Sequence, residues 1–263
     1  MLAPCRPGHH RTRRRTVRVE VALLRSVVVG LAPRRRPALG EVTVPGTVAL
    51  VGGAEWRDGA DFDAQLLEAA GGEVLVLPTA SAYERPDRAV AWAQRWFAGL
   101  GGQATGLMVL SRRDAQDEAN AAAVRAARFI YLGGGSPLHL RSVLKESLVW
   151  EALRQARQEG ATVAGSSAGA MALTDPMVDP RGGALTLGLG LIEQLAVIPH
   201  YGQWSAEKTE RALALAPAGL AVAGIEERTA LIREPGGAWR VAGAGQVHVF
   251  QGGRPAELGT LPG

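Results

Sequence analysis

Short apolar runs alternate with amphipathic stretches along residues 48–173, and this alternation restricts the folds open to the chain. The apolar runs cover residues 48–51, 73–78, 107–110, 129–132 and 162–164. The stretches between them have helical spacing and cover residues 61–71, 88–100, 117–127, 138–144 and 150–159. Strands that alternate with helices of roughly 10–15 residues favour a parallel sheet built from right-handed crossovers. The sequence therefore predicts an α/β fold with a mostly parallel sheet.

Aromatic and turn-forming residues predict two further features of the fold. The helix expected over residues 88–100 carries Trp92, Trp96 and Phe97 at a spacing typical of core-facing side chains. We therefore expect these rings to be core rather than ligand-binding. Residues 239–241 and 246–250 flank a glycine-containing segment, residues 243–245, which predicts a C-terminal β-hairpin.

The basic charge of the chain is confined to its first 40 residues. These contain ten arginines and one glutamate, whereas the other 223 residues hold 19 Lys and Arg against 24 Asp and Glu. We expect residues 1–42 to be a basic, disordered extension and residues 43–263 to be one domain, for which no nucleic-acid partner is expected. A signal peptide or a nucleic-acid-binding arm are alternatives for the extension. Its apolar run, residues 21–29, is shorter than the ~20 residues that span a bilayer, so no membrane association is expected.

The single cysteine, Cys5, excludes an internal disulfide framework and a metal site with several cysteines. The sequence also lacks an H-E-x-x-H motif or a comparable metal-binding spacing. We therefore expect no metal and no organic cofactor, and a cytoplasmic location.

A serine between two glycines lies where an apolar run meets a helix of small residues. Residues 165–169 read Gly-Ser-Ser-Ala-Gly, which matches the G-x-S-x-G nucleophile elbow with Ser167 as the nucleophile. The alternative is a Gly/Ser turn without chemistry. Other glycine or small-residue segments follow the apolar runs, at residues 52–53, 79–81 and 133–135. Because ligands bind at the carboxyl ends of parallel strands, this clustering favours Ser167 as a nucleophile over a turn without chemistry.

A serine hydroxyl becomes a good nucleophile when a base takes its proton and a third group orients that base. His200 ends the apolar run 195–198 after a proline, 33 residues beyond Ser167, and is the expected base. His139 is the alternative base. Either Asp175 or Glu227 is suited to accept a hydrogen bond from the second imidazole nitrogen.

Backbone N–H groups near Ser167 are expected to form an oxyanion hole. The N–H of Ala168 follows the nucleophile directly, and a second donor is expected from Gly134 or Gly135. Removing one such donor typically raises the barrier by ~3 kcal/mol. The glycine loop has neither a G-x-x-x-x-G-K-[ST] nor a G-x-G-x-x-G pattern, which disfavours a phosphate-binding role.

Six segments taken together resemble peptidase family S51, the group of dipeptidase E and cyanophycinase, which is related to class I glutamine amidotransferases. The segments are Gly52-Gly53-Ala54-Glu55, Pro78-Thr79-Ala80-Ser81, Leu132-Gly133-Gly134-Gly135, Gly165-Ser166-Ser167-Ala168-Gly169, Pro199-His200 and Gly224-Ile225-Glu226-Glu227-Arg228-Thr229-Ala230. The resemblance covers residues 46–252. It implies a flavodoxin-like three-layer sandwich, a nucleophile at Ser167 and a base at His200.

The resemblance supports both candidate acids. Asp175 is similar to a residue proposed in dipeptidase E, and Glu227 matches a glutamate of the cyanophycinase pattern; we favour Glu227. Two positions depart from the family: Ile198-Pro199 precedes His200 where cyanophycinases have Asp-Gln, and Ser136 stands where dipeptidase E has Asn.

The resulting hypothesis is a serine exopeptidase or dipeptidase that cleaves small peptides through an acyl-enzyme. The resemblance implies substrates with an N-terminal aspartyl residue, for which Arg181 or Arg228 is a candidate cation. Three alternatives stay open: a non-catalytic amidotransferase-like binding module, a cyanophycinase-like hydrolase of isopeptide-linked substrates, and a hydrolase of non-peptide esters or amides. For the oligomeric state, a homodimer is one alternative.

Overall fold

The computed structural model describes residues 44–181 and 183–263, and its centre is a seven-stranded sheet. The expected extension, residues 1–42, lies outside the described residues, and one domain over residues 43–263 stays a prediction. In spatial order the strands are β13 (Trp239–Gly243), β12 (Thr229–Arg233), β1 (Val48–Val51), β5 (Thr162–Ser166), β4 (Phe129–Leu132), β2 (Glu73–Leu77) and β3 (Gln103–Gly106). The five strands from β1 to β3 are parallel, and β12 and β13 are antiparallel. The mostly parallel sheet is therefore confirmed.

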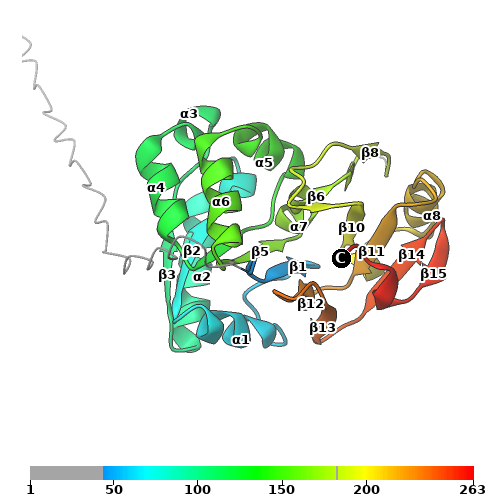
Figure 1. Ribbon diagram of the computed structural model, residues 1–263, viewed down its shortest axis with the longest axis horizontal. Coiled ribbons are helices and arrows are strands. Elements are labelled where there is room, and N and C mark those ends of the chain that lie inside the picture. The colour runs from blue at the N-terminus through cyan, green and yellow to red at the C-terminus, as the bar shows by residue number, and fades with distance from the viewer. Residues whose placement is uncertain (1–43, 182) are drawn as a thin grey trace, which may run out of the picture. The chain divides into compact units, whose positions relative to one another are not determined.

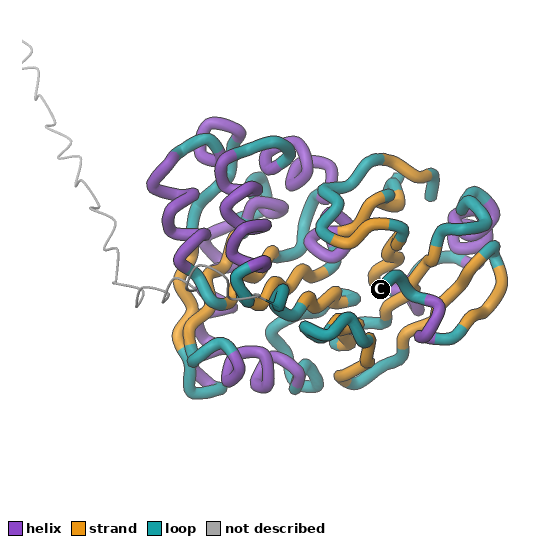
Figure 2. Tube along the Cα trace, viewed as in Figure 1, coloured by secondary structure: helices purple, strands orange, loops and turns teal. Residues whose placement is uncertain are grey.

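Helices cover both faces of this sheet (Figures 1 and 2). They are α1 (Phe62–Ala69), α2 (Pro86–Gly99), α3 (Arg112–Ala115), α4 (Glu118–Ala126), α5 (Pro137–Leu144), α6 (Leu148–Gln158) and α7 (Ala168–Leu173). Successive strand residues point to opposite faces. Val51 packs with Phe62 of α1 and Phe97 of α2, whereas Leu50 belongs to the cluster with α5, α6 and α7. This arrangement is the predicted three-layer sandwich, and burial on both faces explains the continuous apolar runs.

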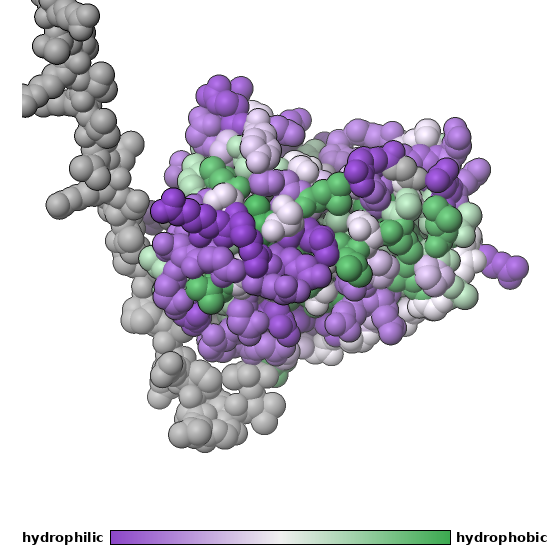
Figure 3. Space-filling view, turned by 90° about the horizontal axis from the view of Figure 1, so that it is seen from above, coloured by the Kyte–Doolittle hydropathy of each residue, from purple (hydrophilic) through white to green (hydrophobic). Residues whose placement is uncertain are grey.

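The surface on the side of α4 and α6 is largely polar. Hydrophilic side chains dominate the surface on the side of α4 and α6 in Figure 3. Among the described residues, no helix combines the length and apolar character that a membrane crossing requires.

A second sheet of four strands lies beside the first and supplies two loops of the candidate site (Figure 1). Its strands, in order, are β10 (Leu195–Pro199), β11 (Ala221–Ile225), β14 (Val247–Gln251) and β15 (Arg254–Ala256), and α8 (Ala206–Ala214) lies between β10 and β11 in the sequence. β10 and β11 are parallel, with Pro199 opposite Ile225. The residues that follow these two strands therefore emerge side by side.

A C-terminal β-hairpin is present, but β14 and β15 form it, and the predicted pairing of residues 239–241 with residues 246–250 is wrong. β14 pairs with β15 and β11, whereas β13 pairs with β12 in the large sheet. Local turn signals identify a change of direction, and only the two sheets determine which strands pair.

Short strand pairs link the two sheets along the chain. β6 (Thr174–Asp175) pairs with β9 (Ile192–Glu193), and β7 (Met177–Val178) pairs with β8 (Leu185–Thr186).

The prediction of a strand over residues 107–110 is wrong. The fifth parallel strand is β3, which has one buried residue and pairs with β2 alone. An edge strand needs little apolar character, so its sequence carries no clear signal. The apolar residues that follow pack from a loop, where Val109 is fully buried.

The aromatic residues of α2 do not all belong to the core. Phe97 is fully buried and Trp96 is half-buried, but 49% of Trp92 is exposed. The prediction of a core position is therefore wrong for Trp92, because that side chain faces a cavity described below.

Candidate active site

Ser167, His200 and Glu227 form a continuous chain of hydrogen-bonded side chains. Ser167 Oγ lies 3.0 Å from His200 Nε2, and His200 Nδ1 lies 2.7 Å from Glu227 Oε1. Ser167 lies between β5 and α7, His200 follows β10, and Glu227 lies just after β11. Both sheets therefore contribute, and every contributor lies at the carboxyl end of a strand.

The Ser167 turn is strained, and its glycine neighbours make that turn sterically accessible. Ser167 has φ 49° and ψ −105°, a sparsely populated conformation for a residue with a side chain. A Cβ at Gly165 would lie 2.6 Å from the Gly169 carbonyl carbon, and one at Gly169 would lie 2.4 Å from the Leu132 oxygen. The close approach of β5, α7 and β4 thus requires both glycines of the G-x-S-x-G motif.

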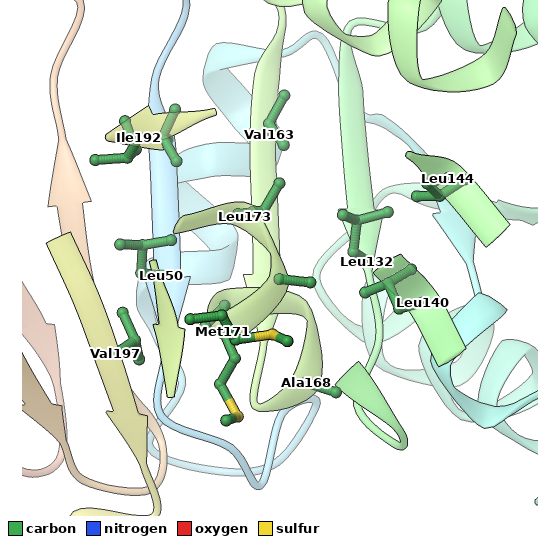
Figure 4. Close-up of a cluster of buried hydrophobic side chains, with 14 of the residues drawn as sticks. Leu50, Leu132, Leu140, Leu144, Val163, Ala168, Met171, Leu173, Ile192 and Val197 are labelled. Atoms are coloured by element: carbon green, nitrogen blue, oxygen red, sulfur yellow. The ribbon is translucent and has the colours of Figure 1, made fainter. Parts of the chain in front are cut away.

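Buried apolar contacts hold α7, the helix that follows Ser167. Ala168, Met171 and Leu173 of α7 are at most 3% exposed and lie in the cluster that contains Leu50 and Leu132 (Figure 4). The Ser167 N–H donates to the Val51 oxygen at 2.9 Å. The turn at Ser167 is therefore fixed by both packing and a backbone hydrogen bond.

The loop after β1 binds the loops that carry His200 and Glu227. The His200 N–H donates to the Gly52 oxygen at 2.7 Å, and the Arg228 N–H donates to the Gly53 oxygen at 2.9 Å. The backbone of Gly52 and Gly53 therefore sets the separation of His200 from Glu227.

The structure does not bring Asp175 or His139 into this chain. The Asp175 carboxylate accepts from the Gly188 N–H at 2.7 Å. His139 Nε2 lies 3.0 Å from the Leu110 oxygen, and its ring contacts Tyr83. Of the two candidate acids, Glu227 is the one hydrogen-bonded to His200.

The candidate oxyanion donors are in different states. The Ala168 N–H belongs to the first turn of α7, where N–H groups lack an intrahelical partner. Gly134 donates its N–H to Glu55 Oε1 at 3.0 Å, so that donor is already engaged. Gly135 lines the cavity described in the next paragraph. Its backbone φ is 133°, and a Cβ there would lie 2.4 Å from the Ala80 oxygen, so the position requires glycine.

A cavity of about 790 Å³ opens beside His200 and Glu227. Its lining includes Glu55, Trp92 and Trp96 together with four arginines, which are Arg57, Arg85, Arg88 and Arg95. The Arg88 guanidinium lies 5.8 Å from the Trp92 ring centre, and Arg85 forms an ion pair with Asp87.

The expected cations lie elsewhere. Arg181 pairs with Asp179 at 2.6 Å, and neither Arg181 nor Arg228 lines the cavity. Two features of the sequence could have identified the cavity-lining side chains that the sequence analysis missed. Glu55 follows a strand end, and Arg88, Trp92 and Arg95 share a helix face at positions i, i+4 and i+7.

A buried carboxyl group lies behind the cavity wall. Burial raises the pKa of Asp63 from 3.8 to about 8, the hydrogen bond from Trp96 Nε1 opposes this, and the charge of Glu55 adds to it. Asp63 is therefore protonated at neutral pH and helps to fix Trp96 in the wall. No group of three or more His, Cys, Asp or Glu residues within the described ranges is arranged to hold a metal ion.

A serine, a histidine and a carboxylate joined in series at the carboxyl edge of an α/β sheet is the arrangement of a serine hydrolase. The particular family follows from comparison with known proteins: the model of peptidase family S51 matches residues 48–240, so the chain belongs to this family of hydrolases.

Relatives and solved structures agree with this assignment. The chain is 29% identical over 220 residues to a cyanophycinase of Synechococcus elongatus, covering 78% of this chain and 67% of the relative. It is 30% identical over 176 residues to a cyanophycinase of Trichormus variabilis, covering 62% and 58%.

The crystal structure of a peptidase from an acI-B1 Actinobacterium has 31% identity and a TM-score of 0.73, covering 83% of this chain and 96% of that one. A putative peptidase E from Listeria monocytogenes shares the fold at 17% identity and a TM-score of 0.57, covering 79% and 98%.

Proposed function

We propose that this peptidase is a cytoplasmic serine exopeptidase, or dipeptidase, that works through an acyl-enzyme. The observation that carries the proposal is the Ser167–His200–Glu227 chain, with distances of 3.0 and 2.7 Å. Both distances lie within the range expected of a nucleophile, its base and the group that orients the base.

Acylation begins when Ser167 Oγ attacks the scissile carbonyl carbon and its proton passes to His200 Nε2. The tetrahedral intermediate then loses the amine, which receives that proton from His200. Water then attacks the carbonyl carbon of the Ser167 ester and gives a proton to His200 Nε2. The C–O bond to Ser167 breaks, Ser167 Oγ takes that proton back from His200, and the acid product leaves. Throughout, the Glu227 carboxylate holds the Nδ1–H tautomer and stabilises the imidazolium.

Developing negative charge on the carbonyl oxygen requires N–H donors. We assign these to Ala168 and Gly135, since Gly134 is engaged by Glu55. Gly134 would join them only when the Glu55 carboxylate accepts a different donor.

The proposed substrate is a small peptide with an N-terminal aspartyl residue. Four arginines line the cavity of about 790 Å³, and their positive charge supports an acidic substrate. The exposed Trp92 side chain in the same lining offers an apolar surface for a bound peptide. A second candidate is an isopeptide-linked substrate, which the two cyanophycinase relatives favour.

The test combines an active-site probe with substrate comparison. A fluorophosphonate probe should label the wild-type protein but not Ser167→Ala. Asp-Leu should be hydrolysed at least tenfold faster than Leu-Leu or a simple ester, and an isopeptide-linked dipeptide tests the second candidate substrate. Absence of labelling and of hydrolysis in the wild type would instead favour a non-catalytic binding module.

A further inference from the structure

Glu55 places a carboxylate at the mouth of the candidate site. It follows β1, is half-buried and lines the cavity together with Gly134, His200 and Glu227. Its Oε1 accepts from the Gly134 N–H at 3.0 Å, and its Oε2 accepts from the buried Ser166 hydroxyl at 2.7 Å. These two bonds hold the carboxylate in one orientation.

We propose that Glu55 binds the free α-ammonium group of the substrate's N-terminal residue and so makes the enzyme an exopeptidase. This inference rests on the proposed function. An ionised carboxylate offers about four acceptor sites, of which the two bonds above use two. Acceptor capacity therefore remains for an ammonium group, which carries three N–H donors.

The distance requirement of such a role fits this position. Within an N-terminal residue, the α-nitrogen and the carbonyl carbon are joined through a single Cα, so they lie about 2.5 Å apart. An anion that binds the ammonium must therefore flank the nucleophile. A Cβ at Gly134 would lie 3.1 Å from Glu55 Oε1 and 3.6 Å from Ser167 Cβ. Glu55 and Ser167 thus border the same small space, which the absent side chain of Gly134 leaves open.

The other carboxylates that line the cavity are less suited to this role. Glu227 is bound to His200, and Glu84 is an exposed side chain. Glu55 is the half-buried carboxylate beside the nucleophile turn, where partial removal of water strengthens a charge-assisted bond.

Glu55 also joins the glycine loop to the nucleophile strand, so a test must separate ligand binding from support of that loop. The isosteric variant Glu55→Gln keeps an acceptor and removes the charge. The matched control is Glu68→Gln, which removes an exposed carboxylate of α1 that does not line the cavity. Each variant is assayed with Asp-Leu and N-acetyl-Asp-Leu and is also reacted with a fluorophosphonate probe, which has no ammonium group.

We expect Glu55→Gln to lower kcat/KM for Asp-Leu by about 10- to 100-fold, as loss of a charged hydrogen bond predicts. The ratio of kcat/KM for Asp-Leu to that for N-acetyl-Asp-Leu should fall at least tenfold, while the rate of probe labelling stays within threefold of wild type. Glu68→Gln should leave both the ratio and the labelling rate unchanged.

Binding measured without turnover gives a second readout. In the Ser167→Ala background, calorimetry should show about 10- to 100-fold weaker binding of Asp-Leu when Glu55→Gln is added. An unchanged substrate ratio in Glu55→Gln, or a loss of probe labelling that parallels the loss of peptidase activity, would overturn the proposal while leaving the serine mechanism intact. Failure of the wild type to react with probe or peptide would instead remove the proposed function, and this inference with it.

Discussion

A Cβ atom at Gly53 would lie 2.1 Å from Cε1 of His200. The imidazole therefore packs directly on the backbone after β1, and Gly53 has φ 115°, which residues with a side chain rarely adopt. The His200 ring packs against Gly53, and this contact fixes how close His200 comes to Ser167.

Gly53→Ala should displace His200 and lower kcat/KM by about 100-fold or more, because misplacement by about 1 Å costs that much. Steady-state kinetics measures this effect. The matched control is Gly99→Ala at the end of α2, where no atom lies within 4 Å of the added Cβ. If Gly53→Ala kept wild-type activity, the contact with His200 would have no bearing on catalysis.

Glu227→Gln should lower kcat by about 10²- to 10⁴-fold, because the amide supports the wrong imidazole tautomer. Asp175→Asn should keep most of the activity, since the amide oxygen can still accept from the Gly188 N–H. Both variants are compared by kcat and by thermal unfolding, which separates catalysis from stability. The opposite order of effects would assign the orienting role to Asp175.

Ser167→Gly should be more stable than Ser167→Ala by about 1 kcal/mol, although both should be inactive. Glycine relieves a strain on the order of 1–3 kcal/mol at the Ser167 backbone, partly offset by its greater freedom in the unfolded chain. Urea unfolding of the two variants measures the difference. Equal stability would mean that the turn stores little strain.

The raised pKa of Asp63, about 8 against 3.8 for the ordinary group, predicts a pH-dependent stability. Between these two values the folded state holds a proton that the unfolded state releases, so the free energy of unfolding falls as pH rises from about 4 to 8. Above the folded-state pKa this contribution is lost. Asp63→Asn should therefore gain stability relative to wild type as pH rises, measured by urea unfolding at pH 5, 7 and 9. A constant difference across this range would contradict the buried, protonated carboxyl group.

Arg95→Gln should raise KM for Asp-Leu several-fold and change kcat little, because Arg95 lines the cavity and lies on α2, away from the residues bonded to Ser167. High salt should reduce the difference from wild type, since exposed charges are screened. Arg113→Gln, on α3, serves as a control that does not line the cavity. An equal effect on KM for Leu-Leu would argue against recognition of an acidic group.

Much of the fold was predictable because apolar patterning records burial on both faces of a sheet. β1, β2, β4 and β5 carry continuous apolar runs, and each was predicted to within two residues. The edge strand β3 lacked this signal. Trp92 had the spacing of a core residue, but spacing alone does not distinguish a core from a cavity wall.

The sequence by itself determined the sheet type, the turn around Ser167 and the family resemblance. The sheet type follows from the spacing of apolar residues. The turn and the resemblance follow from short motifs whose glycines are needed where backbone segments approach closely. It left Asp175 and Glu227 open as partners of His200, since separation along the chain does not measure distance in space. Only the tertiary structure decided that relationship. The parallel pairing of β10 with β11 brings the loops after them together, and the backbone of Gly52 and Gly53 holds both loops in place.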